Sequence, residues 1–291
     1  MLSYILWDID PEIYQISALT IGKYTVGPFS IRWYGLLFAM GFLLGQRIMA
    51  HIFKKEGLKE TLLDSLLLTM VITTVLGARL GHFAFYEPSV FLTNPMQIIT
   101  PPFAGLASHG AIFGILTGLY IYGRVHKVSF LWVTDRIAIV VALAGFFIRM
   151  GNLMNSEIVG KVTEQPWGFI FKRLTDYGPL SQLPRHPAQL YEALSCLVLF
   201  VVLLKIWSLK KSATPHGQLV GVFFIWVFGL RFVWEFFKEP QMTFENDLPL
   251  YMGQILSIPA VLLGIIFLVY SQRNKDQRIF TDELAQKENS I

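Results

Sequence analysis

Seven apolar segments, each about as long as a helix that crosses a lipid bilayer, recur along this chain. They are residues 31–51, 62–86, 104–124, 131–150, 188–208, 218–237 and 250–271. Hydrophobic residues make up 54% of the 291 positions and charged residues only 15%, a balance that is too apolar for a soluble domain of this size. The sequence therefore predicts an all-α integral membrane protein with about seven transmembrane helices.

We expect residues 1–272 to form one seven-helix membrane domain and residues 273–291 to form a tail. Residues 151–187, between the fourth and fifth segments, are too long for a simple turn and predict a small insertion. The first residues are acidic and lack the basic start of a cleaved signal peptide, so we expect a short, partly ordered segment at the membrane surface. No internal repeat is visible, although many transporters contain one.

Basic residues gather in alternate loops, and this asymmetry predicts the orientation of the chain. The basic loops and tail contain Lys54, Lys55, Lys59, Arg124, Lys127, Lys210, Lys211, Arg273, Lys275 and Arg278. The opposite set includes residues 87–103, which contain no Lys or Arg. We therefore expect the N-terminus and the insertion outside, and the C-terminus in the cytoplasm.

Glycines spaced by four predict close contacts between helices, because small residues let helix backbones approach one another in lipid. These are Gly41 with Gly45, Gly77 with Gly81, Gly110 with Gly114 and Gly118, and Gly217 with Gly221. We interpret them as packing sites.

A cluster of polar residues follows the fourth apolar segment, in the run IRMGNLMNSEIVG from Ile148 to Gly160. If the helix continues here, Arg149 and Asn152 share one face, and their donors suit the oxygens of a phosphate. Gly160 would let a lipid headgroup or a neighbouring backbone approach closely. The alternative is an arginine inside the bundle that Glu157 neutralises and that serves only packing.

This run resembles the signature of the prolipoprotein diacylglyceryl transferase family, roughly Gly-Arg-x-Gly-Asn-x-x-Asn-x-Glu-x-x-Gly. The matching positions are Arg149, Gly151, Asn152, Asn155, Glu157 and Gly160. Similar family segments surround His109, Arg231, Tyr34 and His186, so the resemblance covers nearly the whole chain. The chain departs from the family pattern at Ile148, Ala111 and Val227, where Gly, Gly and Tyr are usual.

On the predicted topology, His109, Arg149, Arg231 and Glu235 lie at one membrane depth, near the outer surface. His109 is a candidate to accept a thiol proton, or it is an interfacial histidine satisfied by a backbone carbonyl. Arg231 is a candidate to face the substrate, or it forms a structural salt bridge with Glu235 four residues later.

Three more residues are candidate substrate contacts. Tyr34 is positioned to donate a hydrogen bond to a headgroup, or it is an interfacial aromatic anchor. Arg79 contacts lipid, or it pairs within the bundle, because a charge in a membrane helix needs a partner. For His186, in RHPAQLYE at the entrance of the fifth segment, we expect a supporting role.

The resemblance implies an enzyme that transfers the diacylglyceryl group of phosphatidylglycerol to the lipobox cysteine of a prolipoprotein, the first step of bacterial lipoprotein maturation. It implies catalytic roles for His109, Arg149 and Arg231, with Glu157 and Glu235 orienting the arginines. The implied partners are phosphatidylglycerol, the prolipoprotein signal peptide and membrane lipids, with no nucleic acid, and the implied location is the bacterial cytoplasmic (inner) membrane. The substrate brings the thiol, and Cys196 is the only cysteine in the chain. We expect no metal and no cofactor, because no known metal or nucleotide motif occurs.

Two other functions stay open. A phospholipid transporter or scramblase would also place arginines in a groove for headgroups, but it would need polar residues in the inner half of the membrane too. An inactive relative that binds signal peptides is compatible with the three departures from the family pattern.

Overall fold

The computed structural model describes residues 4–21, 24–98, 100, 105–174, 182–238, 249–274 and 279–281. The longer helices are α1 (Trp33–Lys55), α2 (Glu60–Tyr86), α4 (Ser108–Val125), α5 (Phe130–Met154), α6 (Ala188–Lys210), α7 (Gln218–Trp234) and α8 (Met252–Arg273). Short helical turns are α3 (Val90–Thr93), η1 (Pro95–Ile98), η3 (Lys211–Ala213) and η4 (Glu235–Phe237). The strands are β1 (Ile5–Trp7), β2 (Glu12–Ile16), β3 (Leu19–Ile21), β4 (Tyr24–Val26), β5 (Phe29–Arg32) and β6 (Phe169–Phe171).

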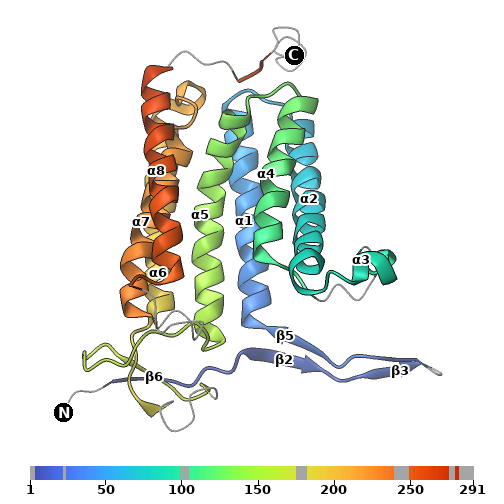
Figure 1. The fold of residues 1–291 in the computed structure, drawn as a ribbon, viewed down its shortest axis with the longest axis vertical. Coiled ribbons are helices and arrows are strands. Elements are labelled where there is room, and N and C mark those ends of the chain that lie inside the picture. The colour runs from blue at the N-terminus through green and yellow to red at the C-terminus, as the bar shows by residue number, and fades with distance from the viewer. Residues whose placement is uncertain are drawn as a thin grey trace. The chain divides into compact units, whose positions relative to one another are not determined.

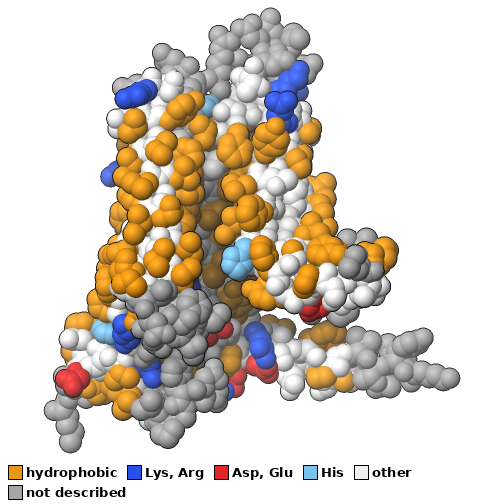
Figure 2. All heavy atoms as spheres, in the orientation of Figure 1, with side chains coloured by type: hydrophobic (Ala, Val, Ile, Leu, Met, Phe, Trp, Pro, Cys, Tyr) orange, Lys and Arg blue, Asp and Glu red, His pale blue; other side chains and the backbone are white. Residues whose placement is uncertain are grey.

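Within the described residues, six helices are long and apolar enough to cross a membrane, namely α1, α2, α5, α6, α7 and α8. The predicted segment 104–124 corresponds to α4, an 18-residue helix with His109 in its first turn and Arg124 in its last. Hydrophobic side chains cover the face of α7 and α8 that Figure 2 shows, as expected where lipid is the solvent. The prediction of a multipass membrane protein is therefore confirmed, with helix ends within about four residues of those expected.

The chain divides into two compact units. The first unit consists of Met1–Ile48, Ala138–Leu209 and Gln218–Arg273, and the second of Met49–Ile137, Lys210–Gly217 and Asn274–Ile291. Most of the predicted site residues belong to the first unit. His109 and Arg79 belong to the second. The single membrane domain expected for residues 1–272 stays a prediction.

Strands at the start of the first unit are a feature that the sequence did not reveal. β2 pairs antiparallel with β5, β3 pairs antiparallel with β4, and β5 leads directly into α1 (Figure 1). β1 pairs in parallel with β6 of the insertion. The prediction of an all-α integral membrane protein is therefore confirmed for the membrane-spanning part, and the short strands before α1 are an addition to it.

A small apolar core anchors the insertion to the end of α5. It consists of Leu153, Val159, Phe169, Phe171 and Leu174, with Trp7 packed against it. The Trp7 indole donates a hydrogen bond of 3.0 Å to the carbonyl oxygen of Leu153. This core stabilises the chain that follows Arg149, and it thereby holds the polar cluster in place.

Helices of the first unit touch where small residues allow it. α7 lies beside α8 (Figure 1), and Gly221 of α7 faces the carbonyl oxygen of Gly264. A Cβ atom on Gly41 of α1 would lie 3.2 Å from the Phe147 ring of α5. α6 approaches α5 at Gly145, where a Cβ would lie 3.1 Å from the Cys196 sulfur. The packing interpretation of Gly41 and Gly221 is confirmed.

In the second unit, α2 and α4 pack along a seam of glycines (Figure 1). A Cβ on Gly77 would lie 2.7 Å from the Cα of Gly114, and one on Gly81 would lie 2.6 Å from the Cα of Gly110. No larger residue fits at these four positions without moving a helix, since the neighbouring atoms are backbone.

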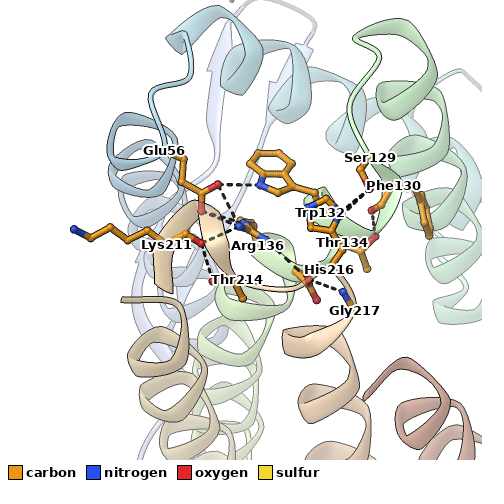
Figure 3. A network of polar contacts seen from close by, with 11 residues as sticks. Glu56, Ser129, Phe130, Trp132, Thr134, Arg136, Lys211, Thr214, His216 and Gly217 are labelled. Atoms are coloured by element: carbon orange, nitrogen blue, oxygen red, sulfur yellow. Dashed lines mark hydrogen bonds and ion pairs between the residues drawn. The ribbon is translucent and has the colours of Figure 1, made fainter. Parts of the chain in front are cut away.

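A buried polar network ties the loops of the second unit together (Figure 3). Arg136 forms hydrogen bonds of 2.9 to 3.2 Å with both carboxylate oxygens of Glu56, which also accepts the Trp132 indole N–H at 2.8 Å. The Asp135 carboxylate accepts the backbone N–H of Gly217 at 2.7 Å. Charges of both signs lie close together, which lowers the cost of burying them.

Candidate active site

Arg149 lies inside α5, which continues to Met154 instead of ending near residue 150. Its Nη1 lies 3.4 Å from Oδ1 of Asn152, so the two side chains share a helix face as predicted. Asn152 in turn donates a 2.7 Å hydrogen bond to Glu157. Glu157 therefore contacts Asn152 directly. Arg149 forms its ion pair with another carboxylate and not with Glu157, the partner considered from the sequence.

The carboxylate that pairs with Arg149 belongs to Glu192 of α6. Its Oε2 lies 2.6 Å from Nε of Arg149, and its Oε1 contacts Nζ of Lys238. The side chains of Glu192 and Lys238 are 8% and 4% exposed, so one buried carboxylate bridges two cations. This triad has a net positive charge, which favours an incoming anion. The sequence placed Glu192 in a family-like run but did not single it out, and it gave no signal for Lys238.

Arg231 lies in the last turn of α7, and its Nε is 3.7 Å from Oε1 of Glu235. The salt bridge considered for this pair is therefore present. It is long, and the Arg231 side chain is 46% exposed, so the pair contributes little to stability. Glu235 is held against Gly253 of α8. The Glu235 carboxylate is therefore mostly buried, at 11% exposed, while the Arg231 guanidinium keeps contact with the exterior.

Arg149 and Arg231 line the same cavity of the first unit, an open space of about 80 Å³ between α5, α6 and α7 that we call the hollow. Its other lining residues are Glu192, Ser195, Cys196, Trp226, Val227, Leu230 and Trp234. Two guanidinium groups and one carboxylate thus face a wall that is otherwise largely aromatic and aliphatic. Such a site suits a ligand that joins an anionic group to apolar chains.

Gly160 and His186 belong to the insertion. Neither is among the described residues that line the hollow. The Gly160 N–H donates to the His186 carbonyl at 3.0 Å, and a Cβ on Gly160 would lie 2.7 Å from the Phe237 carbonyl oxygen. Only a glycine fits at position 160, because neighbouring backbone approaches it closely. This agrees with one of the two interpretations given to Gly160 from the sequence. Nδ1 of His186 lies 3.1 Å from the Tyr191 hydroxyl, and burial lowers the pKa of His186.

Tyr34, near the start of α1, packs its ring against Gly151 of α5. A Cβ on Gly151 would lie 2.7 Å from the Tyr34 ring, so only glycine accommodates this contact. Tyr34 therefore holds the start of α1 against the helix turn that carries Arg149. Its hydrogen bond to a headgroup stays a prediction.

Arg79 has a structural role within the second unit. It is 1% exposed and donates to the carbonyl oxygens of Gln97, Ile98 and Gly105 at 2.6 to 3.3 Å. These bonds hold the connection between α2 and α4. The pairing considered for Arg79 is therefore observed, and its contact with substrate stays a prediction.

His109 lies in the first turn of α4 in the second unit and is exposed. Its ring lies 6.2 Å from the ring of Phe85. It makes no hydrogen bond or ion pair with any residue that the structure describes, so the carbonyl partner considered for it is not observed there. The imidazole is accessible, and its role as a base stays a prediction.

Comparisons with known proteins show the family of this chain. The sequence model of the prolipoprotein diacylglyceryl transferase family matches residues 23–270. Proteins named phosphatidylglycerol–prolipoprotein diacylglyceryl transferase are similar to this chain over most of its length. The one from Tolumonas auensis is 43% identical over 93% of this chain and 99% of its own length, and the one from Chloroherpeton thalassium is 42% identical over 92% and 95%. One from Bacteroides fragilis is 35% identical over 94% of this chain and 98% of its own length. This chain, with its hollow lined by two arginines, therefore belongs to the prolipoprotein diacylglyceryl transferase family of membrane enzymes.

Proposed function

We propose that this protein transfers the diacylglyceryl group of phosphatidylglycerol to the lipobox cysteine of a prolipoprotein, releasing glycerol phosphate. The observation that carries the proposal is the shared hollow, in which Arg149 and Arg231 face largely apolar walls. A phospholipid has the matching chemistry, because its phosphate adjoins a glycerol that carries two acyl chains. Family membership supports the same reaction.

In this reaction a bond forms between the cysteine sulfur and a glycerol carbon, and the bond between that carbon and a phosphate oxygen breaks. The electron pair of the broken bond stays on the phosphate, which therefore gains negative charge as it leaves. The two guanidinium groups that line the hollow stabilise that charge. Losing one such contact typically raises the barrier by about 3 to 4 kcal/mol.

The ion pair with Glu192 gives Arg149 its position. Glu192 holds Nε of Arg149, and Asn152 lies 3.4 Å from Nη1, so the guanidinium is oriented before substrate arrives. Preorganised donors stabilise a transition state without reorganising during the reaction. Asn152 is held in turn by Glu157, which explains why a run of polar residues follows Arg149.

The attacking thiol must lose its proton, and His109 is the proposed acceptor. A neutral imidazole is the side chain that most often accepts a proton in catalysis. In a His109→Gln variant, we expect activity to fall about 100-fold or more if His109 is the base. Retention of most activity would instead assign the proton to water or to another residue.

We place this reaction at the outer face of the bacterial inner membrane, where exported prolipoproteins present their signal peptides. The basic loops after α1, α4 and α6 favour an orientation with the N-terminus outside and the C-terminus in the cytoplasm. In that orientation the insertion and the hollow between the adjoining helix ends face outward.

The test combines purified protein in phosphatidylglycerol micelles with a peptide that carries a lipobox cysteine. Mass spectrometry should detect a gain of one diacylglyceryl group on the cysteine. Arg149→Ala should abolish this gain, whereas Arg173→Ala, which removes an exposed arginine paired with Asp8 and Asp10, should not. Lipid exchange without a mass gain would instead indicate a scramblase, and peptide binding without either would indicate an inactive relative.

A further inference from the structure

One serine holds both tryptophans that line the hollow. The Trp226 indole N–H donates to the backbone carbonyl of Ser195 at 3.1 Å, and the Trp234 indole N–H donates to its hydroxyl oxygen, also at 3.1 Å. The Ser195 hydroxyl donates its own proton to the carbonyl of Tyr191, one turn earlier in α6, at 2.7 Å. Its lone pairs are therefore directed to Trp234.

This arrangement matters because an indole N–H that is left without a partner in an apolar environment costs free energy. Trp234 has packing partners besides its hydrogen bond, since its ring centroid lies 5.4 Å from that of Tyr191 and 6.0 Å from that of Phe237. Ring packing restricts the tilt of the indole, and the hydrogen bond to Ser195 fixes which edge faces α6.

The hollow consequently offers its ligand few polar contacts from this wall. Both indole N–H groups are used by Ser195, and the neighbouring Val227 and Leu230 side chains have no donor. The wall therefore presents apolar ring surface beside the cations of Arg149 and Arg231. The part of a phospholipid that fits such a wall is the glycerol and the first carbons of its acyl chains.

The volume of the hollow supports this assignment. At about 80 Å³ it is smaller than the roughly 300 to 1,000 Å³ of sites that enclose a whole ligand, so it holds only a part of a phospholipid. An acyl chain that reaches the bilayer centre extends about 15 Å, half of a hydrocarbon core of about 30 Å. The chains must therefore leave the hollow after a few carbons and continue in the surrounding lipid.

We propose that Ser195 is a positioning residue for the lipid donor, acting through Trp234. By holding the indole, it fixes the wall against which the glycerol and adjoining acyl carbons pack, and so it determines affinity for the phospholipid more than the rate of the chemical step. This inference rests on the proposed function of the same hollow.

The two hydrogen bonds supply an internal contrast for the test. Ser195→Ala removes the acceptor of Trp234 but leaves the backbone carbonyl that holds Trp226. Ser195→Thr keeps a hydroxyl at the same position. Ser208→Ala is a matched control, because Ser208 lies on the same helix, is exposed, and likewise donates to a backbone carbonyl within its own helix, that of Lys205.

The measurement is the transfer rate as a function of phosphatidylglycerol concentration. In Ser195→Ala, we expect KM for phosphatidylglycerol to rise about 5-fold with kcat changed less than about 2-fold, since 5-fold corresponds to about 1 kcal/mol, the usual net contribution of one hydrogen bond. Ser195→Thr and Ser208→Ala should stay close to the wild type. Trp234→Phe, which leaves α6 intact, should raise KM to a similar extent.

The combined variant Ser195→Ala/Trp234→Phe should be no worse than either single variant, because both remove the same hydrogen bond. An unchanged KM in both single variants, or a fall in kcat with KM unchanged, would overturn the inference. A wild-type protein that forms no lipidated peptide would instead refute the proposed function itself. If Ser195→Ala does not fold, Trp234→Phe alone decides between these results.

Discussion

Replacing Glu192 by Gln tests whether its carboxylate stabilises the site by bridging two cations. In the native protein this carboxylate contacts Nζ of Lys238 and lies 2.6 Å from Nε of Arg149. The carboxamide of the Glu192→Gln variant would keep the shape and an acceptor oxygen but lose the charge. Lys238, only 4% exposed, would then be a buried ammonium without a counterion, whereas Arg149, 27% exposed, is partly screened by its surroundings.

The expected loss of stability comes mainly from Lys238. Breaking a buried ion pair by removing one partner costs about 3–5 kcal/mol, because the remaining charge stays buried. Arg149 is more exposed, so its contribution to the loss of stability is smaller and does not change this range. We therefore expect Glu192→Gln to lower the free energy of unfolding by about 3–5 kcal/mol and to reduce transfer activity, since Arg149 also loses its orienting partner.

The assay is equilibrium unfolding in mixed micelles titrated with a denaturing detergent, followed by circular dichroism. The double variant Glu192→Gln/Lys238→Met removes the stranded ammonium along with the carboxylate. It should recover at least half of the lost stability but not the activity, because Arg149 still lacks Glu192. A Glu192→Gln protein within about 1 kcal/mol of the wild type, or a double variant less stable than the single one, would refute the reasoning.

Three further predictions concern the second unit. Arg79→Met should lower stability by about 2–4 kcal/mol and speed proteolysis between α2 and α4, because the backbone carbonyls of that connection lose their donor; limited proteolysis at equal rates would contradict this. Glu56→Gln should cost about 3–5 kcal/mol, measured by the same unfolding titration, since it removes the charge that Nε and Nη2 of the buried Arg136 contact and leaves only the more distant Asp135 carboxylate, 3.9 Å from Nη1. Burial, together with the charge of Arg136, lowers the pKa of His216 from 6.5 to about 4. The unfolded chain therefore binds a proton there between these values while the folded protein does not, so stability should fall as pH drops from 6.5 to 4, and His216→Gln should show a weaker pH dependence of Tm.

Membrane helices are the part of this fold that a sequence predicts best. A helix such as α8 satisfies all of its backbone hydrogen bonds locally, and lipid selects it by length and hydrophobicity alone. The end of α5 was harder to locate from the sequence, because polar residues such as Arg149 and Asn152 are typical of the end of a membrane span. In the structure the backbone remains helical to Met154. The strands β1 to β5 left no clear signal, since a two-stranded ribbon such as β2 and β5, in which most side chains are exposed, needs no buried alternating face.

The charged pairs were less predictable than the charged residues themselves. Asp135 and Arg136, within an apolar run, are a signal of a buried network that sequence reasoning overlooked. Glu56, the partner of Arg136, follows α1, far away in the chain, and no local pattern connects the two residues. Likewise, Glu157 is close to Arg149 in sequence, but Glu192 is its partner in space.

The sequence by itself determined that the chain is a multipass membrane protein, which residue types carry the chemistry, and which family it resembles, because these depend on composition and on spacing within single helices. Only the tertiary structure decided that Arg149 and Arg231 line one hollow, that Glu192 and Lys238 set the charge beside it, and that Arg79 serves a loop. The physical reason is that an ion pair or a cavity wall depends on which helices meet, and that choice is made by packing between segments far apart in the chain.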